Sequence, residues 1–458
     1  MDGVAFVAQD YHADGTLRPA RYEIEGAEAT GWRIRRDGVS HLDFGPGYRL
    51  LRTSHCGVCA TDLARRHLPF PLPQVTGHEI VALGGDGRPV VVEINASHAA
   101  RGLATDCPWC TLEMGSHCPD RRVLGIHDLP GGFSPWILAP RGAIHTVPSS
   151  IDPLAATFVE PFAAALAAVR VATRVPRRRI AVLGPRRLGS LVVAALAAWR
   201  RRAGAGYEIL ALARRPELRA LAMACGADDA RDPDALREPI ADVVVDTTGS
   251  PAGFARALEL ASDEVHLKTT CGEPSGGLAH ATALVVDELA LVALRDDLAA
   301  PLPGPPLATA VVLPGAPHGL RPAGLRLVSE REAAALPLGG ADVVVAGSLA
   351  EVDAAVRPRA DRERGLVRPR GVVVLAGTGP ARDVLAAALL DRGISVTTSR
   401  CGDFAAALDL LPHAAGDLAM RLTSNVIASS RLADAFATAA RPSAVKVVVT
   451  HSDATLLA

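Results

Sequence analysis

The feature of this sequence that most constrains its fold is an alternation that begins near Leu154. From there, helical stretches rich in Ala and Leu alternate with short runs of β-branched residues. Examples of these runs are RIAVLG, YEILALA, ADVVVDTTG and EVHLKTT. Apolar strands that alternate with helices are typical of a parallel sheet covered by helices on both faces. We therefore expect a doubly wound α/β domain in this part of the chain.

The first 150 residues follow a different pattern. They contain short β-type runs, such as YRLLRT, RPVVVEI and WILAP, which Gly and Pro interrupt. This pattern predicts an irregular, β-rich domain. With 458 residues and 49% apolar content, the chain is long enough for two or three domains.

The overall charge argues against several kinds of partner. A formal net charge of −1 and a pI near 6.9 give no electrostatic footprint for nucleic acid or for an anionic membrane. Arginine interrupts each alanine-rich run, so no apolar stretch reaches the roughly eighteen residues of a membrane span. The N-terminus is acidic where a signal peptide needs a basic start, and we expect a cytoplasmic protein. In that compartment the eight cysteines favour metal ligation over disulfides.

One internal similarity lies in the second half of the chain. Residues 241–272 are echoed by residues 341–379, and VVDELALVALRDDL is echoed by LLDRGISVTTSRCGDF, in the same order. These echoes suggest a partial duplication of a nucleotide-binding-type sheet. The alternative is that any two βαβ units look alike. We interpret residues 300–395 as a structural or oligomer-interface addition, in preference to a second nucleotide site, because they contain no G-x-G-x-x-G at the right place.

Two short motifs, HCGVCATDL and GHEIV, lie about twenty residues apart and contain good zinc ligands. Cys59 supplies a thiolate and His78 an imidazole. Glu160, in FVEPFAAAL, lies at the junction between the two chain halves and can supply a carboxylate. Taken singly, Cys59 could be a core thiol and His78 a buried structural histidine. Further along, Cys107, Cys110 and Cys118 have the spacing of a structural zinc lobe that lacks a fourth ligand.

Together these motifs resemble the zinc-dependent medium-chain dehydrogenases, the family that includes alcohol, sorbitol and threonine dehydrogenases. The resemblance covers nearly all of the chain except roughly residues 300–395. It is carried by the segments CGVCATD, GHEIV, the cysteine lobe, VLGIHDLPGGF, VEPFAAAL, VVVDTTGSP and AARPSAVKVVV. The zinc-free reductase branch of the superfamily is disfavoured, because its members lack the Cys and His pair.

The resemblance implies roles for the residues around the first two motifs. The catalytic zinc ligands would be Cys59, His78 and Glu160. Glu79 matches an acidic residue that approaches the metal from behind. Thr61 matches a hydroxyl that relays the substrate proton, and Asp62 matches a carboxylate that orients the histidine ligand. Ala64 stands where some members have a histidine of the proton path, and His67 is a speculative substitute.

The resemblance also suggests the missing ligand of the cysteine lobe. His98 stands where close members of the family have the first cysteine, and three cysteines with one histidine are an ordinary structural zinc set. We expect a second zinc on His98, Cys107, Cys110 and Cys118. Asp106 and His117 are the alternatives, as is an empty lobe with free thiols.

A dinucleotide-binding turn is expected at AVLGPRRLGS. Gly184, Leu188 and Gly189 fit the G-x-G-x-x-G fingerprint, whereas Arg186 replaces its middle glycine and would either block the site or bind a phosphate. No acid stands at the tip of the second strand, where a carboxylate would bind the ribose of NAD. Arg214 and Arg215 stand there, which favours NADP over NAD. Thr248 completes the expected cofactor residues.

The resemblance therefore implies three segments and one activity. Residues 1–165, joined by 403–458, would form a GroES-like catalytic domain, residues 166–299 a Rossmann-type NAD(P) domain, and residues 300–402 a partly duplicated insertion. The implied protein is a zinc-dependent oxidoreductase that transfers hydride between an alcohol or polyol, or its carbonyl, and NAD(P). We expect a homo-oligomer, either a dimer or a tetramer. The alternative is a degenerate member that keeps zinc but has lost dinucleotide binding and acts as a binding or scaffold protein.

Overall fold

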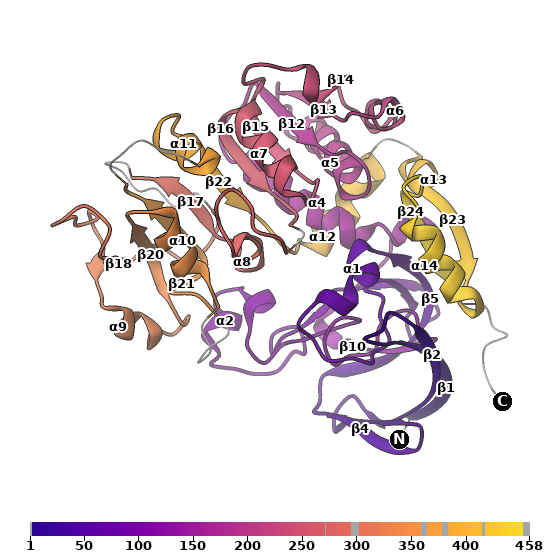
Figure 1. The fold of residues 1–458 in the computed structure, drawn as a ribbon. Helices are drawn as coiled ribbons and strands as arrows, with labels where there is room; N and C mark the ends of the chain where they lie inside the picture. Colours follow the sequence, from indigo (N-terminus) through magenta and orange to yellow (C-terminus); the bar gives the residue numbers. More distant parts are fainter. Residues whose placement is uncertain are drawn as a thin grey trace. The chain divides into compact units, whose positions relative to one another are not determined.

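The computed structural model describes residues 2–270, 272–294, 302–358, 364–377, 383–414 and 417–451 (Figure 1). The chain divides into two units. Unit 1 contains residues 1–163, 404–412 and 416–458, and unit 2 contains residues 164–403 and 413–415. The expected start of the insertion, near residue 300, lies outside the described residues. No helix in the described part of the chain is long and apolar enough to cross a membrane.

Unit 1 begins with a four-stranded antiparallel meander. Its strands are β1 (Asp2–Tyr11), β2 (Leu17–Ala27), β3 (Gly31–Arg36) and β4 (Val39–Phe44). In β2 the side chains of Ala20, Tyr22 and Ile24 are buried, whereas Arg21, between two of them, is exposed. Because successive side chains of a strand point to opposite faces, one face of this sheet lies on the core of unit 1.

A second sheet of unit 1 brings the end of the chain back beside its first hundred residues. Its path is β11–β7–β6–β5–β24–β23, and β10 also pairs with β5. The bounds are β5 (Tyr48–Val58), β6 (Glu79–Leu83), β7 (Pro89–Val92), β10 (Trp136–Pro140), β11 (Ile144–Thr146), β23 (Thr423–Ala428) and β24 (Lys446–Thr450). Since β24 runs antiparallel to β5, with Val447 opposite Val58, it places Lys446 near the loop that follows β5.

Unit 2 contains one eleven-stranded sheet in the order β14–β13–β12–β15–β16–β22–β17–β21–β20–β18–β19. The bounds are β12 (Arg179–Leu183), β13 (Glu208–Leu212), β14 (Asp229–Arg231), β15 (Ala241–Asp246), β16 (Ala261–Leu267), β17 (Ala290–Ala293), β18 (Thr309–Val312), β19 (Arg326–Leu327), β20 (Ala341–Ala346), β21 (Val367–Leu375) and β22 (Ser395–Thr398). All neighbours are parallel except β17 and β22. All six residues of β15 are buried, as expected for a strand covered on both faces.

Helices connect the parallel strands of unit 2. They include α5 (Leu188–Ala203), α6 (Pro216–Ala224), α7 (Pro251–Leu260), α8 (Ala281–Val286), α10 (Leu349–Val356) and α11 (Val384–Leu390). α5 follows the glycine turn after β12 and ends at Gly204, whose φ of 62° is left-handed. A glycine adopts that conformation without steric cost, so it is a natural helix stop. The α/β fold with a β-rich domain and a Rossmann-type sheet, expected from the sequence, is confirmed.

Candidate active site

One buried carboxylate connects two of the three segments of unit 1 that carry the expected zinc ligands. Cys59 is the N-cap of the short helix α1 (Ala60–Leu63), and its backbone N–H donates to Asp62 Oδ2 at 2.8 Å. The backbone N–H of Gly77 donates to the other oxygen, Asp62 Oδ1, at 3.1 Å. Gly77 directly precedes His78. Asp62 therefore connects the Cys59 loop to the segment that begins β6.

His78 lies in direct contact with this arrangement. Its side chain is buried, and Nδ1 is 3.5 Å from Asp62 Oδ1. Burial opposes the imidazolium form, but the charges and hydrogen bonds of Asp62 and Cys59 outweigh it and raise the pKa of His78 well above its usual value. Thr61 Oγ1 is 3.7 Å from Cys59 Sγ, so a hydroxyl lies beside the sulfur. The imidazole, the thiol and the hydroxyl are thus neighbours in the fold.

Glu79 forms a buried ion pair that the sequence analysis did not assign. Lys446 Nζ donates to Glu79 Oε1 at 2.6 Å, and both side chains are almost completely buried. Gly57 on β5 makes room for this carboxylate, because a Cβ at that position would lie 1.9 Å from Glu79 Oε2. The ammonium also lies 5.8 Å from the centre of the Phe158 ring.

Lys446 also connects this pair to the expected metal ligands. Burial lowers the pKa of Lys446, but attraction by Glu79, Cys59 and Glu160 outweighs burial and raises it. Glu160, in the first turn of α4 (Val159–Ala172), is therefore within electrostatic range of the same ammonium as Cys59. The signal in the sequence was the rarity of lysine. The chain has two lysines against 46 arginines, and both lysines are buried.

The donor types of the three expected ligands fit a zinc ion. A thiolate, an imidazole and a carboxylate, here from Cys59, His78 and Glu160, are ordinary protein ligands of zinc. Their ligand atoms are not all within 4.8 Å of one another, a closeness that only the cysteine lobe reaches among the described residues. Ala64, which stands in place of the proton-path histidine, is the C-cap of α1, and the substitute candidate His67 is exposed, with Nε2 3.1 Å from Arg66 Nε.

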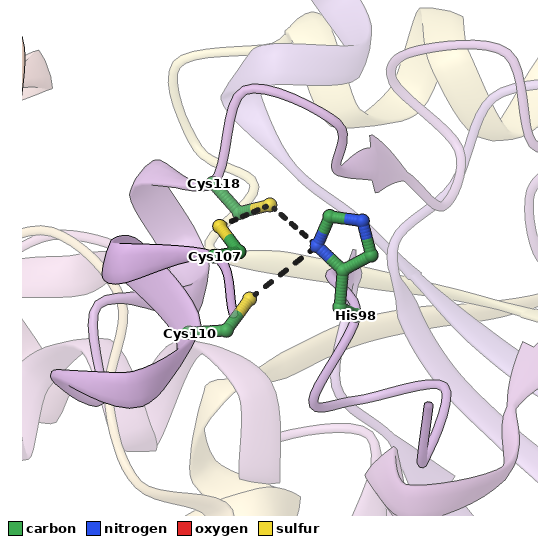
Figure 2. A group of neighbouring side chains, drawn as sticks. All are labelled: His98, Cys107, Cys110 and Cys118. Atoms are coloured by element: carbon green, nitrogen blue, oxygen red, sulfur yellow. Dashed lines mark hydrogen bonds between the residues drawn. The ribbon is translucent and has the colours of Figure 1, made fainter. Parts of the chain in front are cut away.

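The cysteine lobe brings His98 together with its three cysteines (Figure 2). His98 Nδ1 is 3.7 Å from Cys110 Sγ and 3.4 Å from Cys118 Sγ, and Cys107 Sγ is 3.9 Å from Cys118 Sγ. In a tetrahedral site with Zn–S bonds of about 2.3 Å, neighbouring ligand atoms are about 3.6–3.8 Å apart. The four ligand atoms therefore have the spacing of a structural zinc site.

The surroundings of the lobe distinguish His98 from the alternative ligands. Asp106 and His117 are not members of the four-residue group. The ring of His117 instead packs near Trp109, with the two ring centres 6.4 Å apart. His98 Nε2, the nitrogen that faces away from the sulfur atoms, is 3.7 Å from Asp120 Oδ2. A carboxylate at that nitrogen is the usual partner of a metal-bound histidine.

In unit 2, the glycine turn between β12 and α5 has the close packing of a dinucleotide fingerprint. Gly184 has a φ of 84°, and a Cβ there would lie 2.9 Å from Thr248 Cγ2. A Cβ on Gly189 would lie 2.5 Å from the carbonyl oxygen of Gly184. α5 begins at Leu188 without a side-chain cap, so its first N–H groups point out of the helix end. Gly184, Leu188, Gly189 and Thr248 thus meet at the carboxyl ends of β12 and β15.

Three guanidinium groups gather beside this turn. Burial and repulsion by Arg187 and Arg215 lower the pKa of Arg186. Arg214 has a different environment, because its Nε donates to Asp234 Oδ2 at 2.7 Å. The side chain of Arg186 is therefore part of a positive cluster at the tip of the glycine turn, which is the chemistry that binds phosphate.

Comparison with known proteins agrees with both units. Residues 45–149 match the alcohol dehydrogenase GroES-like domain. The chain is 31% identical to L-galactonate-5-dehydrogenase of Escherichia coli over 159 residues, which cover 33% of this chain and 46% of that protein. It is 28% identical to (R,R)-butanediol dehydrogenase of Bacillus subtilis over 272 residues, which cover 51% of this chain and 73% of that one. The first of these alignments thus spans less than half of the relative.

Solved structures share the fold at low sequence identity. A Sinorhizobium meliloti protein assigned as a zinc-binding dehydrogenase and bound to NADP has a TM-score of 0.56 at 19% identity, covering 97% of this chain and 99% of that chain. Galactitol-1-phosphate dehydrogenase of Escherichia coli has a TM-score of 0.57 at 15% identity, with coverage of 97% and 99%. Residues 45–149 thus match the GroES-like domain of alcohol dehydrogenases, and the chain as a whole has the fold of these solved dehydrogenase structures.

Proposed function

We propose that the protein is a zinc-dependent oxidoreductase that transfers hydride between an alcohol or polyol, or its carbonyl, and NADP or NAD. The observation that carries the proposal is the contact of Cys59 with the buried Asp62 and His78, together with the buried Glu79–Lys446 pair. A cytoplasmic location and a homo-oligomeric state are also part of the proposal.

The proposed division of labour follows from the contacts of each residue. Cys59, His78 and Glu160 would hold the catalytic zinc, which when bound makes an alcohol hydroxyl more acidic and polarises a carbonyl. Thr61 places a hydroxyl beside the Cys59 sulfur, where it can accept a proton from the substrate hydroxyl and pass it outward. Asp62 holds the Cys59 and His78 segments in register, and the Glu79 carboxylate accepts a hydrogen bond from Lys446 Nζ.

The central experiment measures metal content and cofactor binding on the purified full chain. About two zinc ions per chain are expected, together with enhanced nicotinamide fluorescence on titration with NADPH or NADH. A substrate panel of alcohols, polyols and their carbonyl forms then identifies the substrate class. Zinc content with no binding of either cofactor at millimolar concentration would refute the oxidoreductase and support the degenerate member that binds zinc alone.

Asp62→Asn should lower zinc affinity at the catalytic site about 10–100-fold, because groups that orient a metal ligand have effects of this size. An asparagine keeps the shape but removes the charge opposite His78. The measurement is zinc retention during competition with a graded chelator. Asp86→Asn, at an exposed carboxylate, is the matched control and should retain zinc like the parent protein. Equal retention by both variants would contradict the assigned role of Asp62.

Arg215→Ala should weaken NADPH binding roughly tenfold or more and leave NADH binding within about twofold, because a lost hydrogen bond to a charged phosphate costs about 1.5–3 kcal/mol. Arg214→Ala is the control, since Arg214 Nε is held by a 2.7 Å hydrogen bond to Asp234, whereas Arg215 Nε lies 3.5 Å from its acidic neighbour, Glu217 Oε1. Fluorescence titration with both cofactors measures the effect. An equal loss for NADPH and NADH, or a larger loss in Arg214→Ala, would exclude Arg215 as the group that selects NADP.

A further inference from the structure

The two halves of the unit 2 sheet repeat each other in strand order and register. One half has the order β13–β12–β15–β16, and the other has the order β19–β18–β20–β21. Ile180 on β12 lies opposite Val243 on β15, and Ala310 on β18 lies opposite Val343 on β20. The pairings β15–β16 and β20–β21 even share the same irregularity, directly after the first residue of each ADVVV segment.

A repeated side-chain contact strengthens this equivalence. Asp242 Oδ2 accepts hydrogen bonds from the two backbone N–H groups at the start of β12, one of them at 3.1 Å. Asp342 Oδ2 accepts hydrogen bonds from the two backbone N–H groups at the start of β18, at 3.1 and 2.8 Å. Two unrelated βαβ units need not share an aspartate that binds the backbone N–H groups at the start of the corresponding strand. The echo in the sequence is therefore a structural duplication.

The last strand of each half is exchanged with the other half. β17 follows β16 in the chain, through α8, but pairs in parallel with β21 of the second half. β22 follows β21, through α11, but pairs in parallel with β16 of the first half. The helices are exchanged in the same way, since α11 packs against α7 and α8 packs against α10 (Figure 1).

The two exchanged strands meet at an approximate two-fold axis. Leu291 on β17 lies opposite Val373 on β21, and Val396 on β22 lies opposite Val265 on β16, so Leu291 and Val396 occupy equivalent positions. β17 and β22 are antiparallel, and the pair that joins them is Leu291 with Val396. A residue that pairs with its own counterpart is the signature of an isologous two-fold contact.

In its described residues, the second half lacks the features that a dinucleotide needs. Where α5 follows β12 in the first half, the described residues between β18 and β19 contain no helix. The Glu351 carboxylate accepts the backbone N–H groups of Gly315 and Gly347, both at 2.7 Å, at the turns that follow β18 and β20. A side chain of the protein thus occupies the anion-binding N–H groups of this half. The duplicated half therefore serves as structure and not as a second cofactor site.

We propose that the second half of the sheet, from β18 to β22 in chain order, is a built-in partner subunit. Two copies of one half-sheet would associate edge to edge through their last strands, as in a two-fold dimer, and this chain closes that contact within itself by exchanging β17 and β22. A sheet edge is otherwise open to pairing with another chain, and a covalently tethered partner covers it at high effective concentration. This edge is therefore closed to a second copy, and any homo-oligomer must use another surface.

The test is a disulfide across the axis in the full chain. Leu291 and Val396 are both completely buried, and directly opposite residues on antiparallel strands have Cβ atoms about 4.5–5.5 Å apart. Under mild oxidation, Leu291→Cys/Val396→Cys should lose two free thiols and run as a single 47.5 kDa chain without reductant. A reducible band at twice that mass would overturn the proposal, because it would place the exchange between chains.

Two controls address the absence of a disulfide and poor folding of the double variant. Ala8→Cys/Ala20→Cys, a buried opposite pair on β1 and β2, shows that the oxidant reaches buried cysteines. If the Ala8/Ala20 cysteine pair forms a disulfide and the Leu291/Val396 pair does not, the proposed pairing of β17 with β22 is wrong. If the double variant folds poorly, chains that carry only Leu291→Cys can be co-expressed with chains that carry only Val396→Cys. No mixed disulfide is expected, and a mixed disulfide would overturn the proposal.

Discussion

Replacing Cys59 with serine should remove one zinc ion per chain and lower turnover at least about a thousandfold. Zinc contributes several kcal/mol of charge stabilisation in the transition state, and each 1.36 kcal/mol corresponds to a factor of ten in rate. Serine keeps the shape of the side chain and its place at the N-cap of α1, but it is a poor ligand for zinc at neutral pH. The measurement combines zinc content with kcat on the substrate found in the panel.

Variants of the lobe give the matching result for the other metal. Cys110→Ser and His98→Ala should each reduce zinc from two ions to one, through loss of one of the four ligands that Figure 2 shows. The folded protein should keep its turnover, since Cys59 and His78 are untouched. Cys225→Ser, a buried cysteine of unit 2, should retain both ions. Loss of both ions in either lobe variant would contradict two separate sites.

The local motifs could be predicted from the sequence because their geometry is set within a few residues. Cys59 and Asp62 lie on one short turn, Gly77 before β6 has a φ of 98°, and Gly189 in the first turn of α5 lies close to the backbone of Gly184. His98 could be predicted only with the resemblance, since it is nine residues from Cys107 and no local rule assigns it to the lobe. Its spacing to Cys110 and Cys118 is a property of the folded loop.

Long-range pairing could not be predicted in this way. Lys446 meets Glu79 because β24 pairs with β5, a contact across 367 residues that no periodicity encodes. The sequence echoes did predict a duplication, but alternation of strands and helices contains no information on strand order. The exchange of β17 and β22 depends on whether each strand pairs with its own half of the sheet or with the other half. The strands of the segment that we interpreted as an addition, residues 300–395, extend the main sheet.

Lys446→Met should lower the free energy of unfolding of the protein by about 3–5 kcal/mol, because it leaves the Glu79 carboxylate buried without its partner. Methionine fills a similar volume, so the loss reports the charge and not a cavity. Urea unfolding of the metal-loaded full chain measures it. Glu79→Gln in the same chain should restore a large part of the loss, since the uncompensated charge is then gone.

The control for this experiment is an exposed pair of the same unit. Arg431→Met breaks the contact with Asp434 and should cost less than about 1 kcal/mol, because water solvates both partners when they separate. Equal costs for Lys446→Met and Arg431→Met would mean that water reaches Glu79 in the folded protein. A large cost that Glu79→Gln does not relieve would instead assign the stability to the aliphatic stem of Lys446 and its contact with Phe158. Only a relieved loss shows that the ammonium holds a charged carboxylate behind the proposed zinc site.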